Sequence, residues 1–498
     1  MSTFRGSHEK LSRSRARTTR RQLLAGGLVA GSLIAGTAGV ALAGGGSGVL
    51  GTVLTTPASI MLGQDTAARD GDRRTDSDAR GPGEVTKVPC DAAKLVAALL
   101  HADTQGGGTL QLAPRCTYVL TEGAFDDDRF DGGVRDAREA ADQAENGGAP
   151  ARPERSPAQV RRDNSSGLPV VYHPITIRGE GATITRDSRA AEFRFFTVRD
   201  GGDLRLTDVT LRNGRSVAEG GSVHVVHGAN AVLEGVTITQ SISLSATGGG
   251  GAVFNDGNLR VVDSTFTDNA ATARTGRGGG ILNGGVLSMS GSTFTRNSAK
   301  SLGGGFANFR GAADVSGSSF EQNHADQGGG MASFSARTRV WDTEVVGNTA
   351  RVGGGIANGD ATVAMRGLQV KENVATGDGG GIWTSRGLAT LDQSIVRANT
   401  AHGNGGGLFV DRSNVPVRHS ELTGNGAVGA RSTGGGIHAT GGQLSLFGSR
   451  VTENRSVHAP GGVSGRHLRI NVDDKTGLTD NRPTNCQGGA ASVQACFR

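Results

Sequence analysis

From about residue 168 onward, short runs of alternating apolar and polar residues recur along the chain, with glycine or asparagine between them. Examples are Val286-Leu287-Ser288-Met289 and Leu444-Ser445-Leu446-Phe447. Alternation with a period of two residues is typical of a β-strand that buries one side. About three such strands recur in every unit of roughly 25 residues, so the sequence predicts a repeat architecture.

Two phrases mark each unit. An apolar-x-x-Asn phrase places asparagines 25 to 29 residues apart, at Asn269, Asn297, Asn323, Asn348, Asn373, Asn399, Asn425, Asn454 and Asn481. A run of glycines precedes an apolar residue at Val253, Ile281, Phe306, Met331, Ile356, Ile382, Leu408, Ile437 and Val463. Asparagine and glycine tolerate the left-handed backbone of a corner, and stacked asparagines can join their amides in a ladder. We therefore interpret both phrases as structural features of the corners.

One unit is too small to close a sheet. If the units stack about 4.8 Å apart, each strand pairs with its equivalent in the next coil and the backbone is satisfied along the stack. A leucine-rich repeat would need a leucine and asparagine consensus that is absent here, and helical repeats would not tolerate so much glycine. The pattern predicts an all-β solenoid over residues 85–498, a parallel β-helix.

The segments before the repeats do not follow the repeat pattern. Asp91 is a good N-cap for an amphipathic helix over residues 92–102, which we expect to cover the first coil. Residues 122–165 are rich in acids, then in proline, arginine and glycine, and predict a disordered insertion.

The first 43 residues look like a cleavable export signal, with a basic start followed by an apolar run that ends at Ala41-Leu42-Ala43. Arg20-Arg21 resembles the twin-arginine type of signal. An uncleaved anchor is the alternative, and no later segment is long and apolar enough to span a bilayer. Residues 44–84 predict a disordered linker.

Composition and charge narrow the function. Glycine makes up 83 of the 498 residues, and aromatic residues only 4%, which suits many small apolar rows better than a round core. The net charge of the whole chain, +6, equals that of the first 43 residues, so the remainder is near neutral. A nucleic-acid partner is therefore not expected.

The chain has four cysteines, an even number that suggests disulfides in an exported protein. Cys90 and Cys116 lie at one end of the mature region and Cys486 and Cys496 at the other, so pairing within each end is the economical arrangement. No cysteine or histidine spacing suggests a metal site, and no motif suggests a cofactor.

Particular residues carry a resemblance to a known family. Phe294-Thr295-Arg296-Asn297 and Gly278-Gly279-Gly280-Ile281 resemble polymorphic outer-membrane-protein repeats. Cys90-Asp91-Ala92-Ala93, Leu112 to Tyr118 and Asn485-Cys486 resemble the first coil and closing loop of exported bacterial β-helix proteins of the pectate-lyase-like superfamily. The resemblance implies a right-handed helix and a secreted protein, in the medium or at the cell wall. The superfamily includes polysaccharide lyases and hydrolases beside proteins with no known reaction.

Catalytic chemistry is not evident in the repeats. Polysaccharide-cleaving enzymes need paired carboxylates, or carboxylates beside a base. The acids expected to point outward are scattered singly, at Asp263, Asp314, Asp342, Asp360, Asp392 and Asp411, and Asp473-Asp474-Lys475 is the densest trio. The histidines sit in different registers, at His324, His402, His419 and His438.

The residue after each glycine-marked apolar position should point outward. In three successive coils these residues are Trp383, Phe409 and His438, which could form a strip for sugar rings or a peptide to stack on. Arg386 and Arg412 follow in adjacent coils and could serve an anionic partner. The alternative is that a corner loop covers the strip.

The sequence favours a secreted, non-catalytic β-helix that binds a polysaccharide or another component of the cell envelope. A polysaccharide lyase or glycoside hydrolase acting on an extracellular glycan is the alternative, and a purely structural surface protein is a third. The ligand and the oligomeric state stay open at this point.

Overall fold

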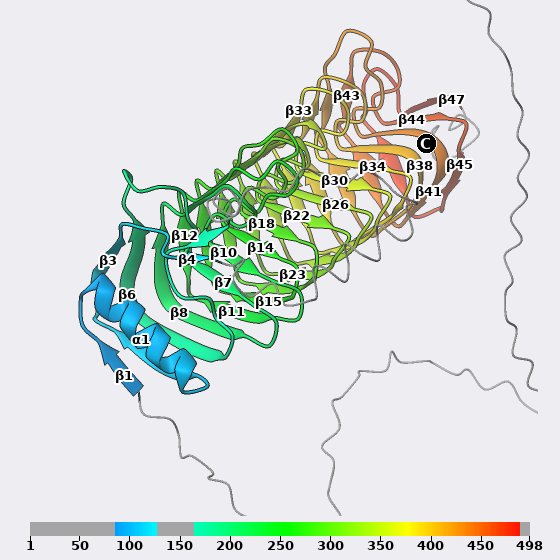
Figure 1. Ribbon diagram of the computed structural model, residues 1–498. Helices are drawn as coiled ribbons and strands as arrows, with labels where there is room; N and C mark the ends of the chain where they lie inside the picture. The colour runs from blue at the N-terminus through cyan, green and yellow to red at the C-terminus, as the bar shows by residue number, and fades with distance from the viewer. Residues whose placement is uncertain (1–84, 127–163, 489–498) are drawn as a thin grey trace, which may run out of the picture. The chain divides into compact units, whose positions relative to one another are not determined.

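The computed structural model describes residues 85–126 and 164–488. Within them, parallel strands of successive coils pair into a 35-stranded and a 10-stranded sheet that run along one axis (Figure 1). The predicted all-β parallel β-helix is therefore confirmed. The expected signal (1–43) and linker (44–84), and residues 127–163 of the expected insertion, lie outside the described residues.

The strands of the coils form four faces along the stack. Face A holds the strands that follow the glycine runs: β7 (Phe196–Val198), β10 (Val223–Val225), β14 (Val253–Asn255), β18 (Ile281–Asn283), β22 (Phe306–Phe309), β26 (Met331–Phe334), β30 (Ile356–Gly359), β34 (Ile382–Ser385), the first parts of β38 (Leu408–Arg418) and β41 (Ile437–Phe447), β44 (Val463–Arg466) and β47 (Cys486–Gly488).

Face B follows face A along the chain. It holds β1 (Val85–Val88), β2 (Gly108–Leu112), the first parts of β6 (Pro174–Arg186) and β8 (Asp203–Arg212), β11 (Asn230–Glu234), β15 (Asn258–Val262), β19 (Val286–Ser290), β23 (Ala312–Ser316), β27 (Arg337–Trp341), β31 (Thr362–Arg366), β35 (Leu388–Asp392), the second parts of β38 and β41, and β45 (Arg469–Val472).

Face C comes next, and face D is the 10-stranded sheet. Face C holds β3 (Thr117–Leu120), the second parts of β6 and β8, β12 (Thr237–Thr239), β16 (Thr265–Thr267), β20 (Thr293–Thr295), β24 (Ser319–Glu321), β28 (Glu344–Val346), β32 (Gln369–Lys371), β36 (Ile395–Arg397), β39 (Glu421–Thr423), β42 (Arg450–Thr452) and β46 (Gly477–Thr479). Face D holds β9 (Arg215–Ser216), β13 (Ile242–Ser243), β17 (Ala270–Ala271), β21 (Ser298–Ala299), β25 (His324–Gln327), β29 (Thr349–Val352), β33 (Val374–Ala375), β37 (Thr400–Ala401), β40 (Gly426–Ala427) and β43 (Arg455–Ser456).

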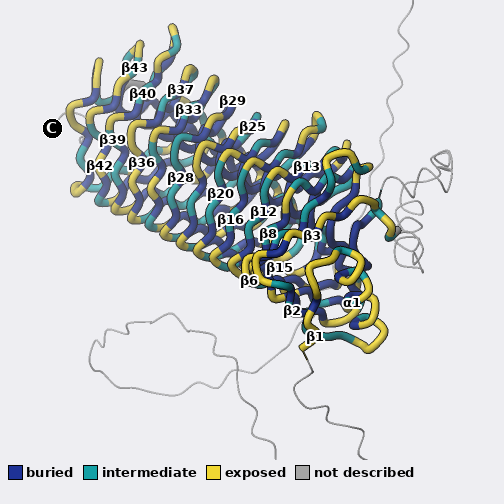
Figure 2. The backbone as a smooth tube through the Cα atoms, turned by 90° about the vertical axis from the view of Figure 1, so that its left-hand side faces the viewer, coloured by how far each residue is buried: buried dark blue, intermediate teal, exposed yellow. Residues whose placement is uncertain are grey.

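Equivalent residues of successive coils lie side by side, so each position of the repeat forms a row. Phe266 is in register with Phe294, and Phe294 with Phe320. Their buried rings stack with centroids 4.5 and 4.8 Å apart. Figure 2 shows the resulting alternation of buried and exposed positions along each coil.

The nine asparagines that follow face C form one buried row. Asn297 is typical: its backbone N–H and its Nδ2 donate to Oδ1 of Asn323, at 2.9 and 3.1 Å, and its Nδ2 also donates to the carbonyl of Phe266 at 2.9 Å. The same bonds link each neighbour from Asn269 to Asn481. Each corner thus supplies the partners that its buried backbone needs.

Two further polar rows were not predicted. At the corner between faces A and B, Asn255 donates to Asn283 at 2.7 Å and Asn283 donates to Asn308 at 2.9 Å. At the corner between faces B and C, serine hydroxyls accept from the backbone N–H one coil earlier; the row includes Ser264, Ser292, Ser318, Ser394 and Ser420. Side-chain hydrogen bonds thus fix many of the corners between these faces.

The N-terminal end is covered by a helix, as predicted. Helix α1 (Ala92–Thr104) begins after Asp91, whose carboxylate accepts from the N–H of Lys94 at 3.0 Å. Leu95 and Leu99 of α1 are buried against the first coils. Among the described residues, no helix has the length and apolar character needed to cross a membrane.

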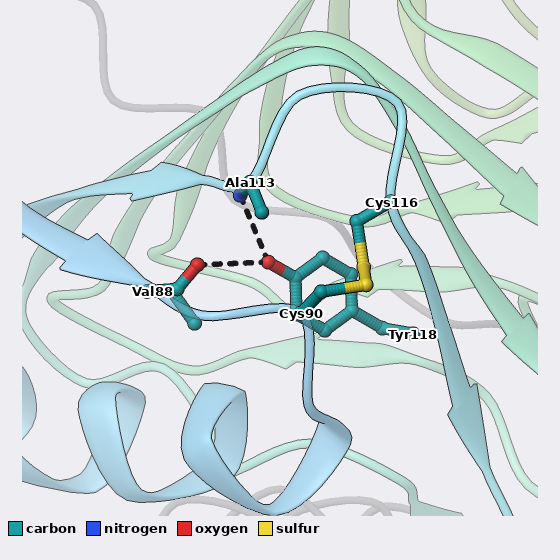
Figure 3. The surroundings of a disulfide bond; sticks show 5 residues. All are labelled: Val88, Cys90, Ala113, Cys116 and Tyr118. Carbon is teal, nitrogen blue, oxygen red and sulfur yellow. Dashed lines mark hydrogen bonds between the residues drawn. A yellow bond between two sulfur atoms is a disulfide. The ribbon is translucent and has the colours of Figure 1, made fainter.

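A disulfide fixes this cap, in agreement with the predicted pairing of Cys90 with Cys116 (Figure 3). Beside it, the hydroxyl of Tyr118 donates to the carbonyl of Val88 at 3.0 Å and accepts from the N–H of Ala113 at 2.9 Å. The other expected disulfide involves Cys496, which lies outside the described residues.

The ends of the expected insertion are ordered. Strands β4 (Phe125–Asp126) and β5 (Ser165–Ser166) pair antiparallel, with Phe125 opposite Ser166. These strands lie at the two ends of the expected insertion at 122–165, and the disorder of the insertion stays a prediction.

Candidate functional site

A row of outward side chains lies at the corner between faces A and B. Its members Arg310, Ser335, Asp360, Arg386 and Arg412 all have positive φ, between 45° and 65°. The left-handed conformation turns the chain from one face into the next. We call these five residues the corner row.

A shallow groove of about 580 Å³ lies beside the C-terminal part of the corner row. Its lining comes from four successive coils: Arg386, Gly387, Arg412, Ser413, Asn414, Gly442, Gln443 and Arg469. Asn414 is in register with Gln443, and Gln443 with Arg469. Three guanidinium groups and two amides thus follow the axis of the helix, and no carboxylate lies among the lining residues. We call this the arginine groove.

Two aspartates outside the lining of the groove hold two of its arginines in place. Asp360 accepts two hydrogen bonds from Arg386, both 2.9 Å long. Asp411 accepts from Nη2 of Arg412 at 3.0 Å and from the hydroxyls of Ser385 and Thr440 at 2.9 and 3.3 Å. The hydrogen bonds from the arginines lower the pKa of both carboxyls, so they stay ionised.

Arg469, the first residue of β45, differs from the other two arginines. Among the described residues it forms no ion pair, and its side chain is exposed. The groove therefore presents one uncompensated positive charge together with two arginines whose acids lie outside the lining. A row of oriented guanidinium donors is suited to carboxylate or sulfate groups.

The expected aromatic strip is in register but mostly covered. Trp383 is opposite Phe409, and Phe409 is opposite His438, with the last two rings stacked 5.5 Å apart. Phe409 is only 9% exposed and His438 only 6%, while Trp383 is half-buried. The expectation of an open strip is therefore wrong for Phe409 and His438.

The cover comes from the chain that leads into each face A strand. A Cβ at Gly379 would lie 2.9 Å from Cβ of Trp383, and one at Gly434 would lie 3.0 Å from Cα of His438. Thr433 also hydrogen bonds to Nδ1 of His438 at 2.9 Å. The glycine runs thus pass over the first outward residue of each strand, as the corner-loop alternative held.

Burial also decides what His438 can do. It lowers the pKa of His438 to about 4, so the imidazole is neutral near pH 7. His324 hydrogen bonds to Thr349 at 2.9 Å, and His419 lies 3.5 Å from Asp392. None of these contacts brings a histidine and a carboxylate together in the arginine groove.

Of the outward acids expected to stand singly, Asp314 and Asp360 are paired with an arginine one coil later, whereas Asp263 and Asp342 form no ion pair within the described residues. Asp268 and Asp326 are paired in the same way as Asp314 and Asp360. Asp268 binds Arg296, Asp314 binds Arg339, Asp326 binds Arg351 and Asp360 binds Arg386, each through two hydrogen bonds. The signal was present, because each acid precedes its arginine by one repeat. Within the described residues, no group of three His, Cys, Asp or Glu side chains could hold a metal ion.

A second hollow, of about 570 Å³, lies near the N-terminal coils, and its charged groups are already engaged. Arg186 is buried and donates to the carbonyls of Asn213 and Ala190, at 3.0 and 2.7 Å. Arg212 donates to Gln240 at 3.0 Å, and Asp268 binds Arg296. The arginine groove, where Arg469 has no ion-pair partner in the described ranges, is therefore the stronger candidate.

Comparison with known proteins leaves the function open. No protein-family model matches the chain, and no curated protein matches it in sequence. Among solved structures, the periplasmic alginate epimerase AlgG is 13% identical with a TM-score of 0.40, over 61% of this chain and 78% of that one. The A-module of the mannuronan C-5 epimerase AlgE6 of Azotobacter vinelandii is 14% identical with a TM-score of 0.34, over 77% of this chain and 94% of that one. Likeness at these values carries no argument about activity.

Proposed function

We propose that the protein is a secreted β-helix that binds an anionic polysaccharide in the arginine groove. The observation that carries this proposal is the placement of Arg386, Arg412 and Arg469 along one groove without a lining carboxylate. Successive coils are about 4.8 Å apart, so the groove repeats its donors on the scale of one sugar unit. A uronic-acid polymer presents carboxylates in the same repetitive way.

The hydrogen-bonding groups of the groove suit a glycan. Asn414 and Gln443 offer both donors and acceptors to sugar hydroxyls. Asp360 and Asp411 orient two guanidinium groups before binding, so less conformational entropy is lost when a carboxylate arrives. Binding should weaken as salt is added, because exposed charges are screened.

Export is part of the proposal. The disulfide between Cys90 and Cys116 is of a kind that persists in oxidising compartments. The basic and apolar start of the chain has the layout of a signal. An extracellular location would place the groove where envelope polysaccharides occur.

Calorimetric titration with polygalacturonate tests the binding. We expect Arg412→Gln/Arg469→Gln to weaken it about tenfold or more, because each lost charge-assisted hydrogen bond contributes roughly 1.5 to 3 kcal/mol. Arg397→Gln is the control for the loss of a surface charge outside the groove, since Arg397 is exposed on face C and forms no ion pair among the described residues. Equal affinity of the double variant and the wild type would refute the groove.

The same titration separates binding from cleavage. A protein that only binds returns the glycan unchanged, without unsaturated products or new reducing ends. Release of either would replace this proposal with the lyase or hydrolase alternative.

A further inference from the structure

Two arginines converge on one aromatic ring at the N-terminal end of the corner row. The guanidinium carbon of Arg277 lies 4.0 Å from the ring centroid of Phe309, and that of Arg310 lies 5.2 Å from it. Arg310 belongs to the corner row, and Arg277 precedes a glycine run on the coil before it. A cation over an aromatic face is held by the quadrupole of the ring.

The charges of this pair are not balanced by acids. Elsewhere on the surface, Arg296, Arg339 and Arg351 each bind an aspartate one coil away. Among the described residues, neither Arg277 nor Arg310 forms an ion pair. Arg277 is half-buried and donates to the carbonyl of Thr247 at 3.4 Å.

The two guanidinium groups also repel each other. Burial lowers the pKa of Arg277, and the charge of Arg310 lowers it further. Arg310 is exposed, and within the described part of the chain no acidic side chain pairs with either of these two like charges. An oxyanion would relieve the repulsion and accept hydrogen bonds from both groups.

We propose that Arg277, Phe309 and Arg310 form a second anion site, which binds a carboxylate or sulfate group of the same polysaccharide that occupies the arginine groove. The inference rests on the proposed function and deepens it. It makes the ligand a long chain that runs along the axis of the helix and is held at two points.

The surface between the two sites offers a path for sugar rings. Arg310 and Arg386 are three coils apart in the corner row, a span of roughly 14 Å at about 4.8 Å per coil. Phe334 lies one coil after Arg310, and Trp383 lies on the coil of Arg386; their half-buried rings have centroids 6.4 Å apart and planes within 18°. Phe334 lies over Gly359, where a Cβ would collide with the ring. Such flat apolar surfaces stack on the C–H faces of sugars.

Two anchors on one chain predict a dependence on chain length. At about one sugar unit per coil, a tetramer of galacturonate is fully taken up by the four coils of the arginine groove, whereas a dodecamer extends from the groove to the second site. The second contact is then intramolecular, so the dodecamer should bind the wild type about tenfold or more tighter than the tetramer. Calorimetry with both oligomers measures the ratio.

Variants test whether the higher affinity for the dodecamer comes from the second site. Arg277→Gln/Arg310→Gln should lower the affinity for the dodecamer to that for the tetramer and leave tetramer binding unchanged. Because Arg277 is half-buried, Arg310→Gln alone is tested as well, with an expected loss of several-fold; Arg397→Gln, with the same change of charge, should keep the full gain.

The outcomes separate this inference from the function on which it rests. If the wild type binds the tetramer and gains nothing from the longer chain, or if the gain survives in Arg310→Gln and in the double variant, the second site is refuted while the groove stands. If the wild type binds neither oligomer, the groove is refuted and the second site with it.

Discussion

At the scale of single residues, the buried asparagines determine how the chain winds. Asn348 donates to the carbonyl of Phe320 and to Oδ1 of Asn373, and its own Oδ1 accepts from the N–H and Nδ2 of Asn323. All of these groups are buried, so each unmet bond costs about 1 to 3 kcal/mol. One asparagine thus supplies hydrogen-bond partners to buried groups of both neighbouring coils.

We therefore expect Asn348→Ala to lower the free energy of unfolding by about 3 kcal/mol or more, because it leaves a carbonyl and two donors without partners. Urea denaturation followed by circular dichroism measures the change. Thr349→Ala, at the exposed next position, serves as the control. A loss below about 1 kcal/mol in Asn348→Ala would mean that the row contributes little to stability.

The second asparagine row is interrupted at Ser333. There, Asn308 donates to the hydroxyl of Thr338 instead of to an amide, and Oδ1 of Asn358 is buried without a hydrogen-bond partner. In the next coil, the positions equivalent to Ser333 and Thr338 hold an asparagine and an apolar residue, Asn358 and Val363. We expect Ser333→Asn/Thr338→Val to continue the row and to stabilise the protein by about 1 kcal/mol. A drop in the urea midpoint would contradict this expectation.

The pH dependence of stability should reveal His438. Its pKa in the folded protein, about 4, is below the value of 6.5 for a free histidine, so the unfolded chain binds the proton first. Stability is therefore full above pH 6.5 and is lost as the pH falls toward 4, by about 3 kcal/mol in all.

His438→Phe, which would extend the row of Phe409, should remove that loss between pH 6.5 and 4. The paired carboxyls Asp360 and Asp411 titrate lower, so their effect comes below pH 3.8. Denaturation midpoints measured across this range provide the test. The same acid loss in the variant as in the wild type would show that His438 is not its source.

At the scale of elements, the sequence predicts the strands and the N-terminal helix well because each has a local signal. Asp91 marks the start of α1, and glycine runs mark the start of face A. The sequence left open whether a corner loop covers Phe409, since alternation tells which way a side chain points but not where the preceding loop passes. The hydrogen bond from Asn255 to Asn283 was not predicted either, because the alternation of apolar and polar residues does not show that these side chains turn into the corner.

The disulfide between Cys90 and Cys116 should stabilise the N-terminal cap against local unfolding. It closes a loop with a sequence separation of 26 residues, for which loop entropy predicts roughly 3 kcal/mol of stabilisation. We expect Cys90→Ser/Cys116→Ser to lose about that amount and to expose α1 to proteolysis before the later coils. Limited proteolysis with mass spectrometry shows the order of cleavage. Cleavage that begins elsewhere at an unchanged rate would indicate that the cap does not depend on the bond.

At the scale of the whole molecule, the repeat places equivalent residues of successive coils side by side in rows. The candidate site is formed where such rows from neighbouring faces meet. Arg386 and Arg412 were predicted from their position one repeat apart, whereas Arg469 was not, because it belongs to face B and meets them only at the corner. Phe309 and Phe334 were likewise missed, since they are the second outward residues of their strands. A site assembled from two faces needs the angle between them, which the repeat period does not contain.

The central claim is that an anionic polysaccharide lies in the arginine groove, and footprinting of arginines tests it most directly. Phenylglyoxal modification, read by mass spectrometry with and without polygalacturonate, reports the accessibility of each guanidinium. The groove predicts that the polymer protects Arg386, Arg412 and Arg469, while Arg397 on face C reacts equally in both samples. Unchanged reactivity of all three groove arginines, or protection of Arg397 alone, would contradict the account.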